Sequence, residues 1–297
     1  MPDVQWAEIP GPERTSSLHS TRVDLERIKT GRIMSIMVLG FATGMLSGLL
    51  GIGGGSVLVP VLVYLLGLSQ HRAHGTSLAY MAPVALFTAL SYSGHGHVDW
   101  LVAIELAVGG VVGAAVGARI CVLTSARRLR TYFGLFLAAI GLRMMYEARA
   151  VFASAVAAGP VVAGHAFPAD QPIGALVIVV IGVVTGAASG LLGVGGGIVM
   201  VPALVLLFGY TQKLAQGISL AVIIPVSISG TLIHSKHGNV RWHIAVWLAL
   251  GGIPGGLVGA RIANVEVGDP VLRGMFGLLM LVMAGLMIRR RRSGVCD

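Results

Sequence analysis

Long apolar runs separated by short polar breaks dominate this chain. Residues 101–118 contain a single acidic residue, and residues 173–193 contain no charged residue. Runs of about 18 or more such residues are long enough to cross the hydrocarbon core of a bilayer. Only helices and closed barrels satisfy their backbone hydrogen bonds in lipid, and runs of this length are typical of helices. The pattern therefore predicts an all-α fold, a polytopic bundle of transmembrane helices.

The sequence contains two copies of one unit. Residues 44–67 read GMLSGLLGIGGGSVLVPVLVYLLG, and residues 186–209 read GAASGLLGVGGGIVMVPALVLLFG. The offset of 142 residues (186 minus 44) holds without a gap as far as Ile120 and Ile262, and more than half of the paired positions are identical. Similarity at a constant offset indicates a duplication, so both copies are expected to fold alike.

Run lengths and breakers predict five helical segments in each copy. They cover 33–50, 56–68, 75–94, 100–120 and 131–147 in the first copy, and 173–192, 198–210, 216–235, 243–262 and 271–288 in the second. The second segment of each copy is too short to cross about 30 Å of hydrocarbon. We therefore predict a broken or re-entrant hairpin in each copy, with its glycine-rich turn buried at membrane depth.

The positions of the basic residues predict the orientation of the copies. Arginines cluster at 127–130 after the fourth segment of the first copy, whereas the equivalent place in the second copy carries acids. Basic loops remain in the cytoplasm, so the copies are expected to be inverted relative to each other, with both termini cytoplasmic. The predicted parts are a cytoplasmic leader (1–32), two membrane repeats (33–147 and 173–289), an extracytoplasmic connector (148–172) and a basic cytoplasmic tail (290–297).

Composition excludes several classes of protein. With 55% hydrophobic and 11% charged residues, the chain has too little charge to coat a soluble domain of its size. The net charge of +9 lies mostly beside apolar runs, which indicates orientation in a lipid bilayer and no nucleic-acid binding. Neither of the two cysteines suggests a disulfide or a metal site. Motifs for nucleotide hydrolysis, proteolysis or ester hydrolysis are missing, so we expect neither an enzyme nor a cofactor.

The strongest local signal is the pair of glycine runs at 48–55 and 190–197, each just before a short helical segment. Glycine permits a left-handed backbone, and the free N–H groups at a helix start bind anions. If the two loops meet near the midplane, they form one substrate site. The alternative is that the glycines only let helices pack closely. The candidate substrate-binding residues are Gly51, Gly53, Gly54, Gly55, Ser56, Gln70 and Ser77 in the first copy, and Gly193, Gly195, Gly196, Gly197, Gln212 and Ser219 in the second.

Five further residues are candidates for coupling or gating. His95 and His237 follow the third segments, where histidine suits a proton relay or simply an interfacial position. Arg119 and Arg261 end the fourth segments, where they either attract the anion or reach the lipid headgroups. Glu105 is the one acid well inside a predicted span. It is either functional or close enough to the interface to be solvated.

The doubled GLLG[IV]GGG…VP pattern, followed in each copy by Q-x-x-A-x-G-x-S-L-A, resembles the sulfite exporter TauE/SafE family of membrane permeases. The match is carried by 48–60 with 70–79 and by 190–202 with 212–221, and the resemblance covers about 33–290. It implies a bacterial inner-membrane carrier for sulfite, sulfonates or similar oxyanions.

We therefore predict a secondary transporter, an exporter, of a small anionic solute. The alternatives are a passive anion or small-solute channel and a membrane scaffold without transport. The specific anion, the coupling ion and an oligomeric state are left open.

Overall fold

The structure, a computed structural model, describes residues 30–121, 126–157, 172–192 and 196–289. These residues form α-helices and one π-helical turn, without a β-strand among them. The helices are α2 (Thr30–Leu50), α3 (Gly55–Leu66), α4 (Gln70–Gly94), α5 (Trp100–Cys121), α6 (Ala126–Ala157), α7 (Pro172–Leu192), α8 (Gly197–Phe208), α9 (Gln212–Lys236), α10 (Trp242–Arg261) and α11 (Asp269–Arg289), and the π-helical turn is η1 (Ile262–Glu266). The predicted all-α polytopic fold is confirmed.

Four described helical stretches are long and apolar enough to cross a membrane, judged by length and composition. They are Ile33–Leu50, Gln212–Lys236, Trp242–Glu266 and Asp269–Leu286. The two helices α3 and α8 have 12 residues each, so the second segment of each copy is short, close to the predicted 56–68 and 198–210. The last turns of α6 extend through Ala157 into the range that the sequence assigned to the connector.

Helices α4 and α9 begin earlier than the sequence predicted. We expected the third segments to start at 75 and 216, with Gln70 and Gln212 in a turn, but both glutamines are the first residues of their helices. The reason is the residue before each one. Ser69 and Thr211 have extended backbones in the N-cap position, and the Thr211 hydroxyl accepts a hydrogen bond from the Leu214 N–H.

Helices of one copy pack against helices of the other. The first helix of each copy packs against the fourth helix of the other, giving the pairs α2 with α10 and α5 with α7. A methyl group on Gly40, Gly44 or Gly48 would overlap the backbone of Leu248, Gly252 or Gly256 in turn. The contacts advance in the same direction along both helices, so α2 and α10 run parallel. Small residues allow this close approach of two helices in a membrane.

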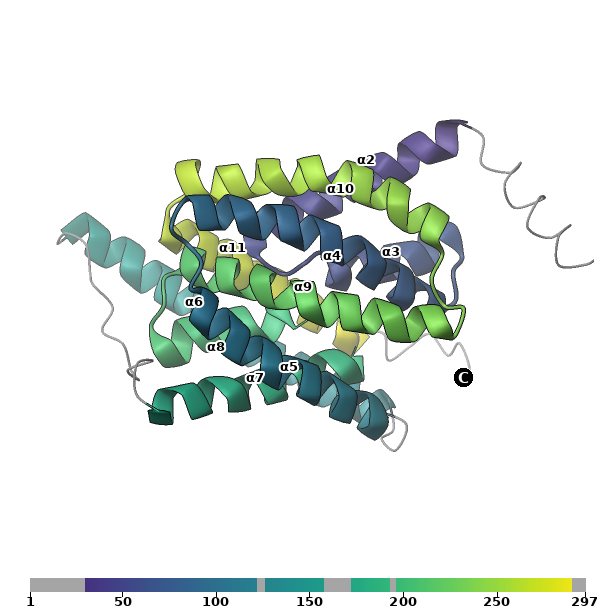
Figure 1. The fold of residues 1–297 in the computed structure, drawn as a ribbon. Helices are drawn as coiled ribbons and strands as arrows, with labels where there is room; N and C mark the ends of the chain where they lie inside the picture. The colour runs from purple at the N-terminus through teal and green to yellow at the C-terminus, as the bar shows by residue number, and fades with distance from the viewer. Residues whose placement is uncertain (1–29, 122–125, 158–171, 193–195, 290–297) are drawn as a thin grey trace, which may run out of the picture.

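Equivalent helices of the two copies run in opposite directions. Helix α4 packs on α9 and α6 packs on α11. Gly75 near the start of α4 meets His234 near the end of α9, while Gly217 near the start of α9 meets the loop after α4 at His97. In Figure 1 the long helices lie roughly along one direction, and α2 begins at the same end of the bundle at which α11 ends.

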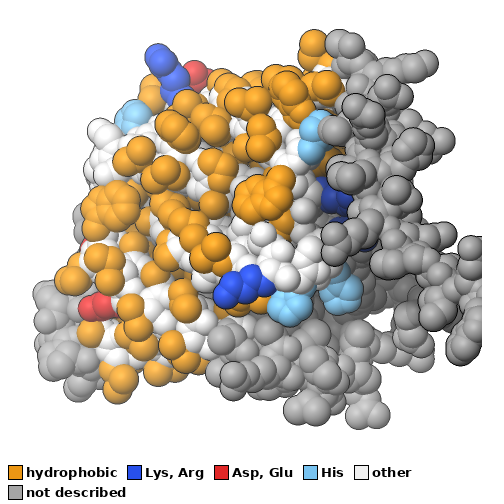
Figure 2. Space-filling model, turned by 45° about the vertical axis from the view of Figure 1, so that its right-hand side comes forward, with side chains coloured by type: hydrophobic (Ala, Val, Ile, Leu, Met, Phe, Trp, Pro, Cys, Tyr) orange, Lys and Arg blue, Asp and Glu red, His pale blue; other side chains and the backbone are white. Residues whose placement is uncertain are grey.

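The outer surface of the bundle is apolar. Figure 2 shows hydrophobic side chains over most of the described surface on one face, with few charged groups among them. Large side chains such as Leu65, Leu101 and Tyr146 are mostly exposed. A soluble protein rarely exposes such a large continuous apolar area. The chain is therefore a multi-pass membrane protein whose exposed apolar side chains face lipid.

Candidate functional site

The first glycine loop is a buried turn with a left-handed backbone. Gly51, Gly53 and Gly54 have φ angles of 69°, 74° and 73°, a region that other residues rarely occupy. All residues from Gly51 to Ser56 are buried. A Cβ on Gly51 would lie 2.6 Å from the Cβ of Gln216. The glycines are therefore required both by the turn and by its close contact with α9.

This loop lies beside the middle of α4. A Cβ on Gly55 would lie 3.3 Å from the hydroxyl oxygen of Ser77 and would overlap the thioether of Met81, close to the midpoint of α4. The loop therefore lies inside the bundle, as expected for the buried glycine turn of a broken or re-entrant hairpin. The backbone N–H groups from Ile52 to Ser56 have no hydrogen-bond partner among the described residues. They are the free donors that a helix start offers to an anion.

The start of α8, at the end of the second glycine run, meets the first loop. A Cβ on Gly197 would lie 2.9 Å from the carbonyl oxygen of Gly51 and 2.9 Å from the hydroxyl oxygen of Ser219. The described end of the second glycine run therefore lies against the first loop. Gly196 has a right-handed helical backbone, unlike its counterpart Gly54. The candidates Gly193 and Gly195 lie outside the described residues.

Hydrogen-bond donors without partners surround the meeting loops. The hydroxyls of Ser47, Ser56 and Ser219 and the Nε2 amide of Gln216 are buried and have no hydrogen-bond partner among the described residues. Buried polar groups nearly always have partners, because an unmade hydrogen bond costs roughly 1–3 kcal/mol. Each of these groups can donate a hydrogen bond, which suits a negatively charged ligand.

The sequence analysis missed Gln216. The Tyr92 hydroxyl lies 2.8 Å from the Gly48 carbonyl oxygen and 3.0 Å from Gln216 Oε1, and it can donate its one proton to either. These contacts fix the amide with its Nε2 group unpartnered. The available signal was the spacing: Gln212, Gln216 and Ser219 lie at positions i, i+4 and i+7, which share one helix face.

The other polar candidates have different surroundings. The Ser77 hydroxyl donates to the sulfur of Met81 at 3.8 Å, a weak bond, and is buried beside Gly55. Gln70 is exposed, whereas its counterpart Gln212 is fully buried with both amide atoms unpartnered. The structure therefore brings Ser56, Ser77 and Ser219 to the glycine loops and leaves Gln70 away from them.

The coupling and gating candidates do not converge on the loops. His95 and His237 are exposed at the ends of α4 and α9, and the Nδ1 atom of each lies within hydrogen-bond distance of a carbonyl four residues earlier. Arg261 is exposed, Glu105 is half-buried with no ion-pair partner among the described residues, and the side chain of Arg119 is not described. Their roles in coupling stay predictions.

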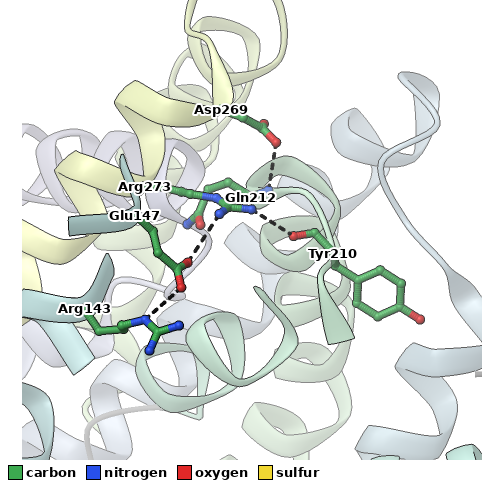
Figure 3. A network of polar contacts seen from close by, with 6 residues as sticks. All are labelled: Arg143, Glu147, Tyr210, Gln212, Asp269 and Arg273. Carbon is green, nitrogen blue, oxygen red and sulfur yellow. Dashed lines mark hydrogen bonds and ion pairs between the residues drawn. The ribbon is translucent and has the colours of Figure 1, made fainter. Parts of the chain in front are cut away.

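A polar network at one end of the bundle was not predicted (Figure 3). Glu147 of α6 binds Arg143 at 2.9 Å and Arg273 of α11 at 3.5 Å, and the side chain of Arg273 is only 13% exposed. Asp269, one turn before Arg273, accepts a hydrogen bond of 3.0 Å from the Gln212 backbone N–H. The network joins α6, α9 and α11 where α9 and α11 begin. Such pairings between distant segments leave no periodic signal in a sequence.

The described residues contain no group of three histidine, cysteine, aspartate or glutamate side chains that would hold a metal ion. A small crevice beside Gly196 is lined by Gly110, Gly186, Gly196, Met200, Val222, Ile223 and Val226. Since this lining is apolar, the donors for a polar ligand come from the loops and the serines.

Comparison with known proteins gives consistent matches. The model of the family described as "Sulfite exporter TauE/SafE" matches residues 12–144 and 178–295. A "Probable membrane transporter protein" of Xylella fastidiosa is 33% identical over 257 residues, which cover 85% of this chain and 92% of that protein. The "Probable membrane transporter protein YunE" of Bacillus subtilis is 32% identical over 238 residues, covering 76% and 87%. No solved structure matches the chain.

Proposed function

Because the chain belongs to the sulfite exporter TauE/SafE family, and is thus a membrane transporter, we propose that it is a secondary transporter that exports a small anion. The substrate class is sulfite, a sulfonate or another sulfur or organic oxyanion. The membrane is the bacterial inner membrane, and both termini are cytoplasmic. The family description and the chemistry of the glycine loops support the substrate class independently of each other.

One observation carries the proposal: the first glycine loop meets the start of α8 in the core, among buried donors that have no partners among the described residues. The hydroxyls of Ser47, Ser56 and Ser219 surround the free N–H groups of the first loop. Neutral donors compensate an oxyanion without the cost of burying a cation. The positive end of the α3 dipole adds to the attraction.

The opposite directions of equivalent helices support an inverted-repeat transporter. Helix α4 runs antiparallel to α9, and α6 runs antiparallel to α11, so each copy is related to the other by reversal across the bundle. In secondary transporters of this kind, the substrate site lies at the repeat interface near the membrane midplane. Alternating access then exposes one site first to one side and then to the other.

The competing functions differ in what they require of the loops. A passive channel uses the same donors. Its flux does not respond to a pH gradient, and it does not saturate with substrate concentration as the flux of a carrier does. A scaffold shows no substrate-dependent flux. The closely packed core around Gly51 and Gly197 favours a carrier.

The test is flux in proteoliposomes with a matched pair of variants. Gly54 and Gly67 both have left-handed backbones, with φ angles of 73° and 63°, but Gly54 faces the core whereas a Cβ on Gly67 would meet nothing within 4 Å. Uptake of radiolabelled sulfite should be abolished in Gly54→Leu and retained in Gly67→Leu, although both substitutions strain the backbone similarly. The second loop is tested in parallel by Gly196→Leu, which should also stop flux.

Insertion of each variant is checked by its yield in membranes and its elution as a single species. Normal flux in both Gly54→Leu and Gly196→Leu would exclude the glycine loops as the substrate site. Wild-type vesicles that move none of sulfite, sulfate, thiosulfate, sulfonates or small carboxylates would exclude the proposed function.

A further inference from the structure

We infer that one face of α9 forms half of the anion path, and that the buried amide of Gln212 is a second anion site on it, between the glycine loops and the end of the bundle where α9 begins. This inference rests on the proposed function, which places that end outside the cell. The end is called the outer end below. Nothing in the family match or in the named relatives assigns this site.

The path follows a stripe of unpartnered polar atoms. Gln212, Gln216 and Ser219 lie at i, i+4 and i+7 on α9, all three have no exposed surface, and each has at least one polar side-chain atom without a partner among the described residues. At 1.5 Å per residue, the stripe spans roughly 10 Å along the helix. In an apolar membrane helix such a stripe is costly, which is the usual mark of a polar pathway.

The inner end of the stripe reaches the glycine loops. A Cβ on Gly51 would touch the Gln216 side chain, and a Cβ on Gly197 would lie 2.9 Å from the Ser219 hydroxyl oxygen. An anion held at the loops is therefore next to Ser219 and Gln216 already. Moving outward by one helical turn brings it to Gln212.

The outer end of the stripe lies within the polar network of Figure 3, where Gln212 is drawn between Asp269 and Arg273. The Gln212 backbone is bound by Asp269, and Arg273 reaches the carbonyl oxygen of Tyr210 at 3.5 Å, two residues before Gln212. Gln212 is nonetheless left with a free side-chain amide and a free side-chain oxygen. A buried amide beside a largely buried guanidinium offers an oxyanion both a neutral and a charged donor.

The corresponding face of α4 differs in exposure, so the two halves of the path are not equivalent in this structure. The equivalents of Gln212, Gln216 and Ser219 are Gln70, His74 and Ser77. Gln70 is exposed, whereas Gln212 is fully buried. The half of the path on α9 is therefore closed in this structure, and the Glu147–Arg273 pair lies over its outer end.

Thiol labelling from outside tests whether water and anions reach this face. Single cysteines replace Gln212, Gln216 and, as an equally buried control on another side of α9, Ile218, in a chain whose Cys121 and Cys296 are changed to serine. The probe is a membrane-impermeant, negatively charged methanethiosulfonate applied to transporting vesicles. Gln212→Cys and Gln216→Cys should be modified at least tenfold faster than Ile218→Cys. Equal rates at all three positions, or modification at none, would overturn the path.

Transport by Gln212→Leu separates this inference from the proposed function. Loss of one hydrogen bond to a charged ligand should lower sulfite flux about tenfold or more, while sulfite still raises the unfolding temperature through the central site. Unchanged flux in Gln212→Leu would refute the second site and leave the central site standing. A wild-type protein without flux or stabilisation by any tested anion would refute both.

Discussion

Two buried serines on α9 should respond to truncation in opposite ways. The Ser219 hydroxyl has no partner among the described residues, whereas the Ser227 hydroxyl donates to the Ile224 carbonyl oxygen at 3.0 Å. Their exposed fractions are 0% and 1%, so burial does not distinguish them. We expect Ser219→Ala to weaken anion binding without weakening the fold, and Ser227→Ala to leave anion binding unchanged.

The magnitudes follow from the partners of each hydroxyl. An unpartnered buried hydroxyl costs roughly 1–3 kcal/mol, so the empty Ser219→Ala protein should be at least as stable as the wild type. Ser227→Ala loses a local bond with a net value of about 0.5–1.5 kcal/mol. In the complex, a hydrogen bond from Ser219 to an anion is worth about 1.5–3 kcal/mol, so its loss should raise the Kd about 10- to 100-fold.

The assay measures thermal unfolding of purified protein with and without sulfite, together with flux. Ser219→Ala should unfold at the wild-type temperature or above it in the absence of sulfite, and should need about 10- to 100-fold more sulfite for the same shift. Ser227→Ala should show the wild-type dependence on sulfite. The reasoning is refuted if Ser219→Ala loses stability while its sulfite dependence is unchanged, because the hydroxyl would then serve the fold alone.

Three further predictions concern the glycines and the charged network. Gly54→Ala should lose about 1–2 kcal/mol of stability because of its left-handed backbone, while Gly196→Ala should lose none; equal losses in thermal unfolding would contradict this. Gly44→Leu should prevent α2 from packing on α10, measured as loss of monodisperse protein after extraction, and a well-behaved variant would refute the contact. Glu147→Ala should lower the free energy of unfolding by about 1–3 kcal/mol, because it removes the ion-pair partner of the largely buried Arg273 guanidinium. Arg143→Ala, whose side chain is 67% exposed, should lower it by under about 1 kcal/mol. The reverse order in thermal unfolding would be inconsistent with the network.

The symmetry between the copies holds at some contacts and fails at others. Ser77 faces Gly55 as its counterpart Ser219 faces Gly197, so the same spacing recurs at both loops. In contrast, the side chain of Gln70 is exposed, whereas that of its counterpart Gln212 is fully buried. An inverted-repeat carrier must be asymmetric in any one state, because only one side of the site is open at a time.

Gln70, a predicted ligand, is exposed whereas its counterpart Gln212 is buried, because equivalence in sequence does not guarantee equivalent burial. The two glutamines have the same motif around them, and the sequence offers no means to separate them. Beside Gln212 lie Asp269 and the Glu147–Arg273 pair, which are contributed by α6 and α11. These contacts join residues far apart in the chain.

What the sequence determined by itself was the membrane location, the duplication, the number of helices in each copy and the buried first glycine turn. Length and hydrophobicity are sufficient for these because lipid allows few backbone conformations. Tertiary structure alone decided that α2 pairs with α10, that Gln216 and Ser219 meet the loops, and that Glu147 meets Arg273. Each of these depends on distant segments packing together, and the local pattern of hydrophobic and polar residues carries no information on which partner a helix face will meet.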